Sequence, residues 1–331
     1  MANAPKIVLL GGGTGSFTLL QGLKKLTADI TAIVSMSDDG GSTGVLRDEL
    51  GVLPPGDVRQ CLVALSDTPE VRDLFSYRFT EGRFTGQSLG NIILSGLEVR
   101  YGNLPKAIQV AGDILHIKGA VVPVTLDKHT LVVHDGAATH RGEHVIDGDV
   151  SLSADATVRL DPAPRLNPAA AKAIAKADLL VIAPGSLYTS LIPLLAVQGM
   201  FDALAASSAP LVWVANLINK PRQTDGWHVV DYVKQLERYM GEGRITTVLY
   251  NNQPIESNLL LRYAQDSEYP VDTAKERFNE INAVPISAPL IATEVNKRER
   301  GDALQRTLIR HDAVVVAAQI EHIIKGLRSA A

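Results

Sequence analysis

The sequence of 331 residues predicts an α/β fold that is doubly wound around a mostly parallel sheet. The first reason is a pair of short apolar runs, 6–10 and 30–36, that both read as buried strands. Between them, 17–26 has the pattern of a crossover helix. The second reason is a glycine-rich loop directly after each run. A β-α-β unit places both loops at the carboxyl edge of the sheet, where open α/β folds bind nucleotides.

Three further strand-and-loop units, at 179–190, 211–219 and 245–252, give the third reason. They alternate with helical patterns at 191–206 and 225–240, which is typical of a doubly wound parallel sheet. Because parallel strands end at one edge, the loops after all five strands are expected to share one crevice.

Two segments interrupt this alternation. Residues 45–116 carry only helical patterns and are expected to form a lid or wall beside the glycine loops. Residues 119–160 are β-rich and are expected to form a small antiparallel insertion. The predicted domains are therefore a nucleotide-binding domain of 1–118 and 161–331, which includes the helical block, and a β insertion of 119–160. The last part, 281–328, is expected to hold edge strands and a closing helix.

The first loop, Gly11-Gly12-Gly13-Thr14-Gly15-Ser16, predicts a phosphate site. Glycines permit positive φ and close backbone approach, so several N–H groups can converge on one anion. Thr14 or Ser16 is expected to cap the next helix, whose amino end attracts phosphate. The strict dinucleotide fingerprint needs glycine at position 16, and no lysine follows to make a Walker A motif. A simple tight turn is the alternative.

The second loop, Ser37-Asp38-Asp39-Gly40-Gly41-Ser42-Thr43-Gly44, adds two carboxylates. Asp38 stands where dinucleotide folds place the acid that accepts the ribose hydroxyls. Asp39 beside it offers a second oxygen ligand, so that the pair is a candidate Mg²⁺ site. The alternative is that both aspartates only cap the turn before a helix near Val45.

Other polar residues at strand ends and helix starts complete the candidate site. Arg59 is a candidate phosphate clamp, and Asp57 is either a helix cap or a metal ligand. Ser186 is either a helix cap or a ligand contact. The residues expected to bind the ligand are Gly11, Gly12, Gly13, Thr14, Gly15, Ser16, Asp38, Asp39, Gly40, Gly41, Ser42, Asp57, Arg59, Asn91, Gly185, Ser186, Tyr188, Thr189, Asn216, Asn251 and Asn252.

The composition excludes several classes of protein. The net charge of −4, without a basic stripe, argues against nucleic acid as the main partner. The single cysteine, Cys61, cannot form an internal disulfide and is expected to pack inside a helix. No apolar stretch reaches membrane-spanning length and no signal peptide precedes the first strand, so a cytoplasmic location is expected. The eight histidines lack the spacing of a zinc site.

Taken together, the motifs resemble the gluconeogenesis factor (YvcK-like) family. The matching segments are Ile7–Gly15, Ser37–Gly44, Pro54–Arg59, Ser88–Asn91, Pro184–Ser190 and Asn251-Asn252. The resemblance implies a Rossmann-like fold and a crevice that binds a nucleotide sugar such as UDP-N-acetylglucosamine, or a dinucleotide. It also implies a cytoplasmic role in cell shape and wall synthesis on gluconeogenic carbon sources, through cell-wall or regulatory protein partners. A homo-oligomer is expected.

The same family is related to 2-phospho-L-lactate transferase, a Mg²⁺-dependent enzyme. Here 47–49 and 54–56 resemble the gluconeogenesis branch instead, which favours a binding protein without turnover. Two alternatives stay open. One is a metal-assisted transferase in which Asp38, Asp39 or Asp57 holds Mg²⁺ against phosphates. The other is an NAD(P)-dependent oxidoreductase, for which no acid or base of a hydride site is evident.

Overall fold

The computed structural model describes residues 4–148, 150–293 and 308–330. Within these ranges the strands form a seven-stranded sheet in the order β10-β9-β8-β7-β1-β2-β3 and a three-stranded sheet in the order β5-β4-β6. Every neighbouring pair in the large sheet is parallel, and both pairs in the small sheet are antiparallel. The predicted α/β fold, doubly wound with a mostly parallel sheet, is confirmed.

The elements have the following bounds. The strands are β1 Ile7–Gly11, β2 Ile30–Val34, β3 Ala120–Pro123, β4 Thr130–Asp135, β5 Ala138–Arg141, β6 Thr157–Asp161, β7 Leu179–Ile182, β8 Leu211–Val214, β9 Thr247–Asn251 and β10 Val284–Ala288. The helices are α1 Gly13–Leu23, α2 Gly41–Leu50, α3 Gly56–Leu65, α4 Pro69–Ser76, α5 Leu89–Tyr101, α6 Leu104–Leu115, α7 Glu143–Asp147, α8 Pro168–Ala175, α9 Ile192–Leu195, α10 Met200–Ala206, α11 Val229–Met240, α12 Ser257–Gln265 and α13 Ala313–Ala330.

The central strands are apolar along their whole length because both faces of the sheet are covered. Every residue of β1, β7 and β8 is buried. Ile7 of β1 pairs with Ile30 of β2 on one side and with Leu179 of β7 on the other. The strand order reverses direction between β1 and β7, and open sheets bind ligands outside the carboxyl ends of the strands at such a point.

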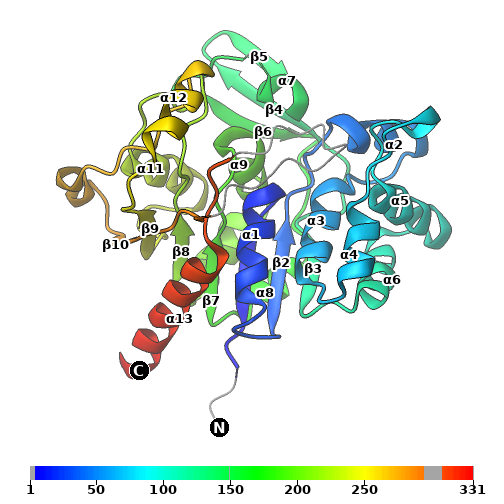
Figure 1. Ribbon diagram of the computed structural model, residues 1–331, viewed down its shortest axis with the longest axis horizontal. Helices are drawn as coiled ribbons and strands as arrows, with labels where there is room; N and C mark the ends of the chain where they lie inside the picture. The colour runs from blue at the N-terminus through cyan, green and yellow to red at the C-terminus, as the bar shows by residue number, and fades with distance from the viewer. Residues whose placement is uncertain (1–3, 149, 294–307, 331) are drawn as a thin grey trace.

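Helices α2 to α6 form the block expected at 45–116, at the right of Figure 1. Two polar side chains cap helices of this block. The side chain of Ser88 accepts from the Asn91 N–H at the start of α5, and that of Asn103 accepts from the Lys106 N–H at 2.9 Å. Cys61 is fully buried in α3. Helix α1 packs between α3 and α13, which joins this block to the carboxyl-terminal helix.

The antiparallel insertion is smaller than expected. Residues 120–123 form β3, which pairs in parallel with β2 at the edge of the large sheet, so the antiparallel sheet begins only at Thr130. A short β-rich run has the same composition in either kind of sheet, so its pattern did not distinguish them. Residues 143–147, expected as part of the β pattern, form helix α7.

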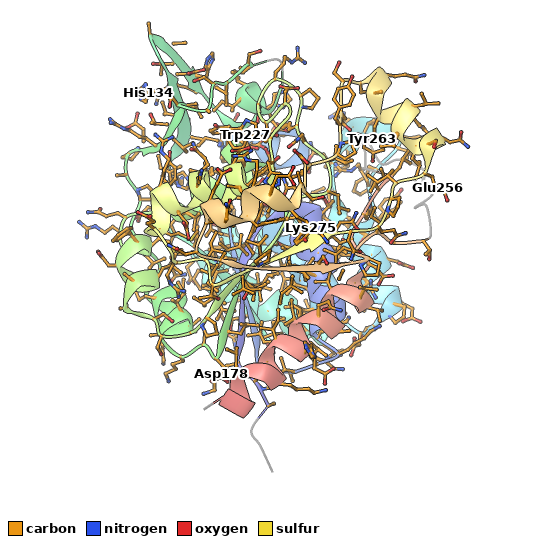
Figure 2. The ribbon with its side chains drawn as sticks, turned by 90° about the vertical axis from the view of Figure 1, so that its left-hand side faces the viewer. His134, Asp178, Trp227, Glu256, Tyr263 and Lys275 are labelled. Carbon is orange, nitrogen blue, oxygen red and sulfur yellow. The ribbon has the colours of Figure 1, made fainter. Side chains whose placement is uncertain are left out.

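The amino ends of the strands in the large sheet and the small antiparallel sheet lie at opposite ends of the molecule. Figure 2 shows Asp178 at the bottom, near the start of the chain, and His134 of the small sheet at the top. Asp178 ties the amino end of the large sheet by accepting from the Lys6 N–H at 2.8 Å. The carboxyl ends of the strands therefore face the antiparallel insertion.

The carboxyl-terminal part contains the edge strand β10 and the closing helix α13, as expected for 281–328. Its stretch 294–307 lies outside the described residues. Across the part of the chain that the structure describes, no helix is long and apolar enough to cross a membrane.

Candidate functional site

A cleft of about 950 Å³ lies at the carboxyl ends of the central strands. The loops after β1, β2, β7 and β8 line it, together with the start of α3, the helix α7 and residues 309–311. The crevice expected from the sequence thus gathers four of the five strand-end loops. The fifth, after β9, does not line the cleft.

The amino ends of α1, α2 and α3 converge on this cleft. Their N-cap residues are Gly12, Gly40 and Pro55, whose side chains have no polar atom that could accept from the first-turn N–H groups. Residues 13–16 of the first glycine loop form the first turn of α1, so neither Thr14 nor Ser16 is its cap. Backbone N–H groups and helix dipoles of this kind attract anions.

Two glycines admit the carboxylates of Asp38 and Asp57 to the cleft. A Cβ on Gly12 would overlap with Oδ2 of Asp57. A Cβ on Gly56 would lie 2.5 Å from Oδ2 of Asp38 and 2.5 Å from Oγ1 of Thr43. Both glycines therefore have to lack a side chain for the acids to reach these positions.

The environment of these acids favours their neutral forms. Burial, followed by the charge of Asp38, raises the pKa of Asp57 to about 7. Burial is also the main cause that raises the pKa of Asp38, although Thr43 and the Gly40 N–H donate hydrogen bonds to its carboxylate. Asp57 is not the cap of α3, since this helix begins at Gly56 after Pro55. Its carboxylate accepts from the Gly13 N–H at the start of α1 instead.

Asp39, predicted together with Asp38 as a candidate Mg²⁺ site, bonds to the start of α7. Its two carboxylate oxygens accept from the backbone N–H groups of Glu143 at 3.0 Å and His144 at 2.7 Å. It therefore holds the start of α7 against the loop after β2, and it does not line the cleft.

Helix α7 brings three polar residues to the cleft that no sequence pattern indicated: Glu143, His144 and Asp147. Burial, then the charges of Asp38 and Asp147, raise the pKa of Glu143 to about 9. The acids of this cleft thus come from both the large sheet and the insertion. The sequence alone could not predict that α7 lines the cleft, because its position depends on how the insertion folds over the sheet.

A buried network holds the wall formed by α3 and α5. Asn91 accepts from the Nε of Arg59 at 2.9 Å and donates to the Oγ of Ser42 at 3.3 Å. Ser42 in turn donates to Gln87 at 2.8 Å. Arg59 also donates to the carbonyl of Phe75. Asn91 and Ser42 therefore fix the wall and set the position of the Arg59 guanidinium at the cleft.

The loops after β7 and β8 are tied to each other and to α7. Both side-chain amide atoms of Asn216 bond to the backbone of Gly185. The Oγ1 of Thr189 lies 2.9 Å from Oδ1 of Asp147, which also pairs with Lys220. These contacts hold the carboxyl end of α7 against the loops after β7 and β8.

Most of the expected ligand-binding residues line the cleft. They are Gly12, Gly13, Thr14, Gly15, Asp38, Gly40, Gly41, Ser42, Asp57, Arg59, Asn91, Gly185, Ser186, Thr189 and Asn216. Besides Asp39, five do not line it. Gly11 ends β1, Ser16 is buried in α1 and Tyr188 is buried with its hydroxyl on the Ser153 carbonyl. Asn251 bonds to the backbone of Gln253 and Leu290, and Asn252 follows it.

Several other lining residues were absent from the expected set. Besides those of α7 they include Ser35, Thr43, Gly56, Lys220, Arg310 and His311. Thr43 and Gly56 belong to motifs that the sequence did single out. His311 is far along the chain, and its Nε2 lies 3.0 Å from the Ala215 carbonyl at the end of β8.

Among the described residues, no three His, Cys, Asp or Glu side chains gather closely enough to hold a metal by themselves. Mg²⁺ is commonly held by one or two carboxylates together with the phosphates of a ligand. Asp38 and Asp57, beside three helix amino ends, fit that arrangement.

Comparison with known proteins agrees with the architecture. The sequence profile described as 2-phospho-L-lactate transferase CofD matches residues 7–291. The chain belongs to the CofD family. Within this family, the "Gluconeogenesis factor" of Bacillus subtilis is 35% identical over 331 residues, which cover 98% of this chain and all of that protein.

Two further relatives extend the CofD comparison. A protein of Nostoc sp. is 42% identical over 282 residues, which cover 84% of this chain but only 61% of the Nostoc protein. The crystal structure of a Bacillus halodurans protein superposes with a TM-score of 0.88 at 33% identity and covers 96% of this chain and 100% of that one. The resemblance to gluconeogenesis factors is therefore confirmed.

Proposed function

We propose that the cleft binds a nucleotide sugar, such as UDP-N-acetylglucosamine, and that this member of the CofD family acts as a gluconeogenesis factor in cell morphogenesis on gluconeogenic carbon sources. In this proposal the amino end of α1 holds the diphosphate and Asp38 accepts the ribose hydroxyls. The segment 185–189 and residues near Asn216 contact the base and sugar. The protein acts in the cytoplasm as a regulator that binds its ligand without turnover.

The convergence of α1, α2 and α3 carries this proposal. Three helix amino ends without polar N-cap side chains face one cleft, and each adds N–H donors and a partial positive charge. Arg59, Arg78 and Lys220 add cationic side chains around them. A diphosphate matches this set of donors, and the volume of about 950 Å³ leaves room for the nucleoside and sugar.

A Mg²⁺-dependent transferase is the second candidate, and the acids favour it. Asp38 and Asp57 are half-buried at a site that otherwise attracts anions, and a divalent cation would compensate both charges. These two residues would hold Mg²⁺, since the carboxylate of Asp39 is bonded to α7. The metal would neutralise charge on the phosphates of a nucleotide-activated substrate.

Calorimetric titration with UDP-N-acetylglucosamine, with and without Mg²⁺, tests the first proposal. Binding without consumption of the ligand over several hours supports the regulator, and metal-dependent consumption supports the transferase. Asp38→Ala is expected to abolish binding, whereas Glu49→Ala, an exposed acid of α2 outside the cleft, leaves it unchanged. Failure of the wild-type protein to bind any UDP-sugar contradicts the proposal. Titration with NAD and NADP in the same instrument tests the dinucleotide alternative.

A further inference from the structure

Two donor side chains of the large domain, Thr189 and Lys220, meet a single carboxylate of the insertion. The Oγ1 of Thr189 lies 2.9 Å from Oδ1 of Asp147 and 2.7 Å from Oγ of Ser186. The ammonium of Lys220 pairs with the same oxygen of Asp147. All four residues line the cleft. The Thr189 hydroxyl and the Lys220 ammonium, which follow β7 and β8, thus converge on an anion that the protein itself supplies, and the Ser186 hydroxyl bonds to Thr189.

This donor set suits a phosphate or carboxylate of a ligand as well as it suits Asp147. Hydroxyl and ammonium donors bond to any oxyanion at such distances, and charge-assisted bonds are the stronger ones. The ion pair is accessible, because the Lys220 side chain is 26% exposed and that of Asp147 is 45% exposed. A dissolved anion can therefore compete with Asp147 for these donors.

The attachment of α7 allows Asp147 to leave without unfolding the insertion. Asp39 holds the amino end of this helix, and Gln223 donates to the carbonyl of Ile146 at 2.8 Å. A rotation of the Asp147 side chain is enough to release Thr189 and Lys220. The charge of Asp147 also contributes to the raised pKa of its neighbour Glu143.

We propose that Asp147 is a built-in competitor for the anionic group of the ligand, and that this group displaces Asp147 from Thr189 and Lys220. This inference rests on the proposed function and adds a form of regulation to the same cleft. The contact of Asp147 with Thr189 and Lys220 lowers the apparent affinity for the ligand, because part of the binding free energy is needed to displace Asp147 from these donors.

The test is a titration with UDP, and separately with pyrophosphate, of four proteins: wild type, Asp147→Asn, Lys220→Met and Asp155→Asn. Removal of the competing charge in Asp147→Asn is expected to raise the affinity for UDP about three-fold, the scale of a partly exposed ion pair. Lys220→Met, which removes a donor, is expected to lower it about ten-fold. Asp155→Asn removes an exposed acid of the same insertion outside the cleft and is expected to leave the affinity unchanged.

The sign of the effect separates this inference from a structural role. If Asp147 only held α7 in place, Asp147→Asn would bind UDP equally or more weakly, and that result overturns the inference while the proposed function stands. If neither wild type nor Asp147→Asn binds UDP or pyrophosphate, the proposed function fails and the inference falls with it. Thermal unfolding of each variant verifies that it is folded.

Discussion

Gly15 of α1 lies directly against the carbonyl of Pro184, two residues after the end of β7. A Cβ at position 15 would overlap with this carbonyl oxygen, and it would lie 3.2 Å from the Cγ of Pro184. This contact joins the first loop to the third one across the point where the strand order reverses. The glycine is needed there because a backbone group, which cannot swing away, occupies the space of a side chain.

Alanine substitutions at three glycines are expected to have three different outcomes. Gly15→Ala is expected to cost about 2–3 kcal/mol of unfolding free energy, because the backbone has to shift. Gly12→Ala displaces the Asp57 side chain, so we expect little loss of stability and a marked loss of UDP affinity. Gly96→Ala, which has open space in α5, is expected to stabilise the protein by about 0.5–1 kcal/mol. Urea unfolding measures the stability of each variant, and titration measures its UDP affinity. Equal stability of all three variants would contradict the close contact described at Gly15.

The hydrogen bonds between Asn216 and Gly185 indicate that Asn216 positions the loop after β7, which lines the cleft. The side chain accepts from the Gly185 N–H at 3.1 Å and donates to the Gly185 carbonyl at 2.8 Å. Asn216→Ala is expected to cost about 1 kcal/mol of stability and to lower UDP affinity about ten-fold, because the loop donors lose their alignment.

Asn251→Ala is the matched control for Asn216→Ala. Asn251 braces the backbone of Gln253 and Leu290 in the same manner, but outside the cleft. A similar loss of stability with unchanged UDP affinity is expected. Equal losses of affinity in the two variants would argue that stability alone controls binding.

The buried His311 is expected to make the stability of the protein depend on pH. Burial lowers the pKa of His311 from 6.5 to about 4, although its bond to the Ala215 carbonyl opposes the shift. Between pH 6.5 and pH 4, His311 is protonated in the unfolded chain but neutral in the folded protein. The contribution of His311 to stability is therefore complete above pH 6.5 and is lost as the pH falls toward 4. The contribution lost is at most about 3 kcal/mol.

Unfolding by urea at pH 7.5 and pH 5 measures this effect in wild type and in His311→Gln, whose amide can still donate to Ala215. The drop in stability between the two pH values is expected to be smaller in His311→Gln. His322→Gln, which changes an exposed histidine of α13, is expected to keep the wild-type drop. Identical drops in all three proteins would show that His311 does not bind its proton as described.

Cys61 is expected to be unreactive in the folded protein. The side chain is fully buried, and burial raises the pKa of the thiol, so almost no thiolate is present near neutral pH. Ellman's reagent is expected to label it only when the protein unfolds, with a rate that follows urea concentration. Rapid labelling in buffer without denaturant would mean that α3 opens locally.

The sequence predicted those parts of the site that local patterns encode. Apolar runs such as 6–10, followed by glycine, indicate both a strand and the end of the strand where a ligand binds. Asp38 was found in this way, and Asp57 was found from its place at the start of a predicted helix. Glu143 and Asp147 were not, because their position depends on how the antiparallel insertion folds back over the sheet. Asn251 shows the converse: its strand-end position was correct, yet the side chain braces a turn.

The position of β1 in the middle of the sheet has a consequence for synthesis of the chain. Its first neighbour, β2, follows within one helix, but Leu179 of β7, which pairs with Ile7, comes 172 positions later in the chain. At ribosomal rates that is roughly ten to thirty seconds, during which one apolar edge of the nascent amino-terminal unit has no partner strand. Until β7 emerges from the exit tunnel, that edge is a natural substrate for a chaperone.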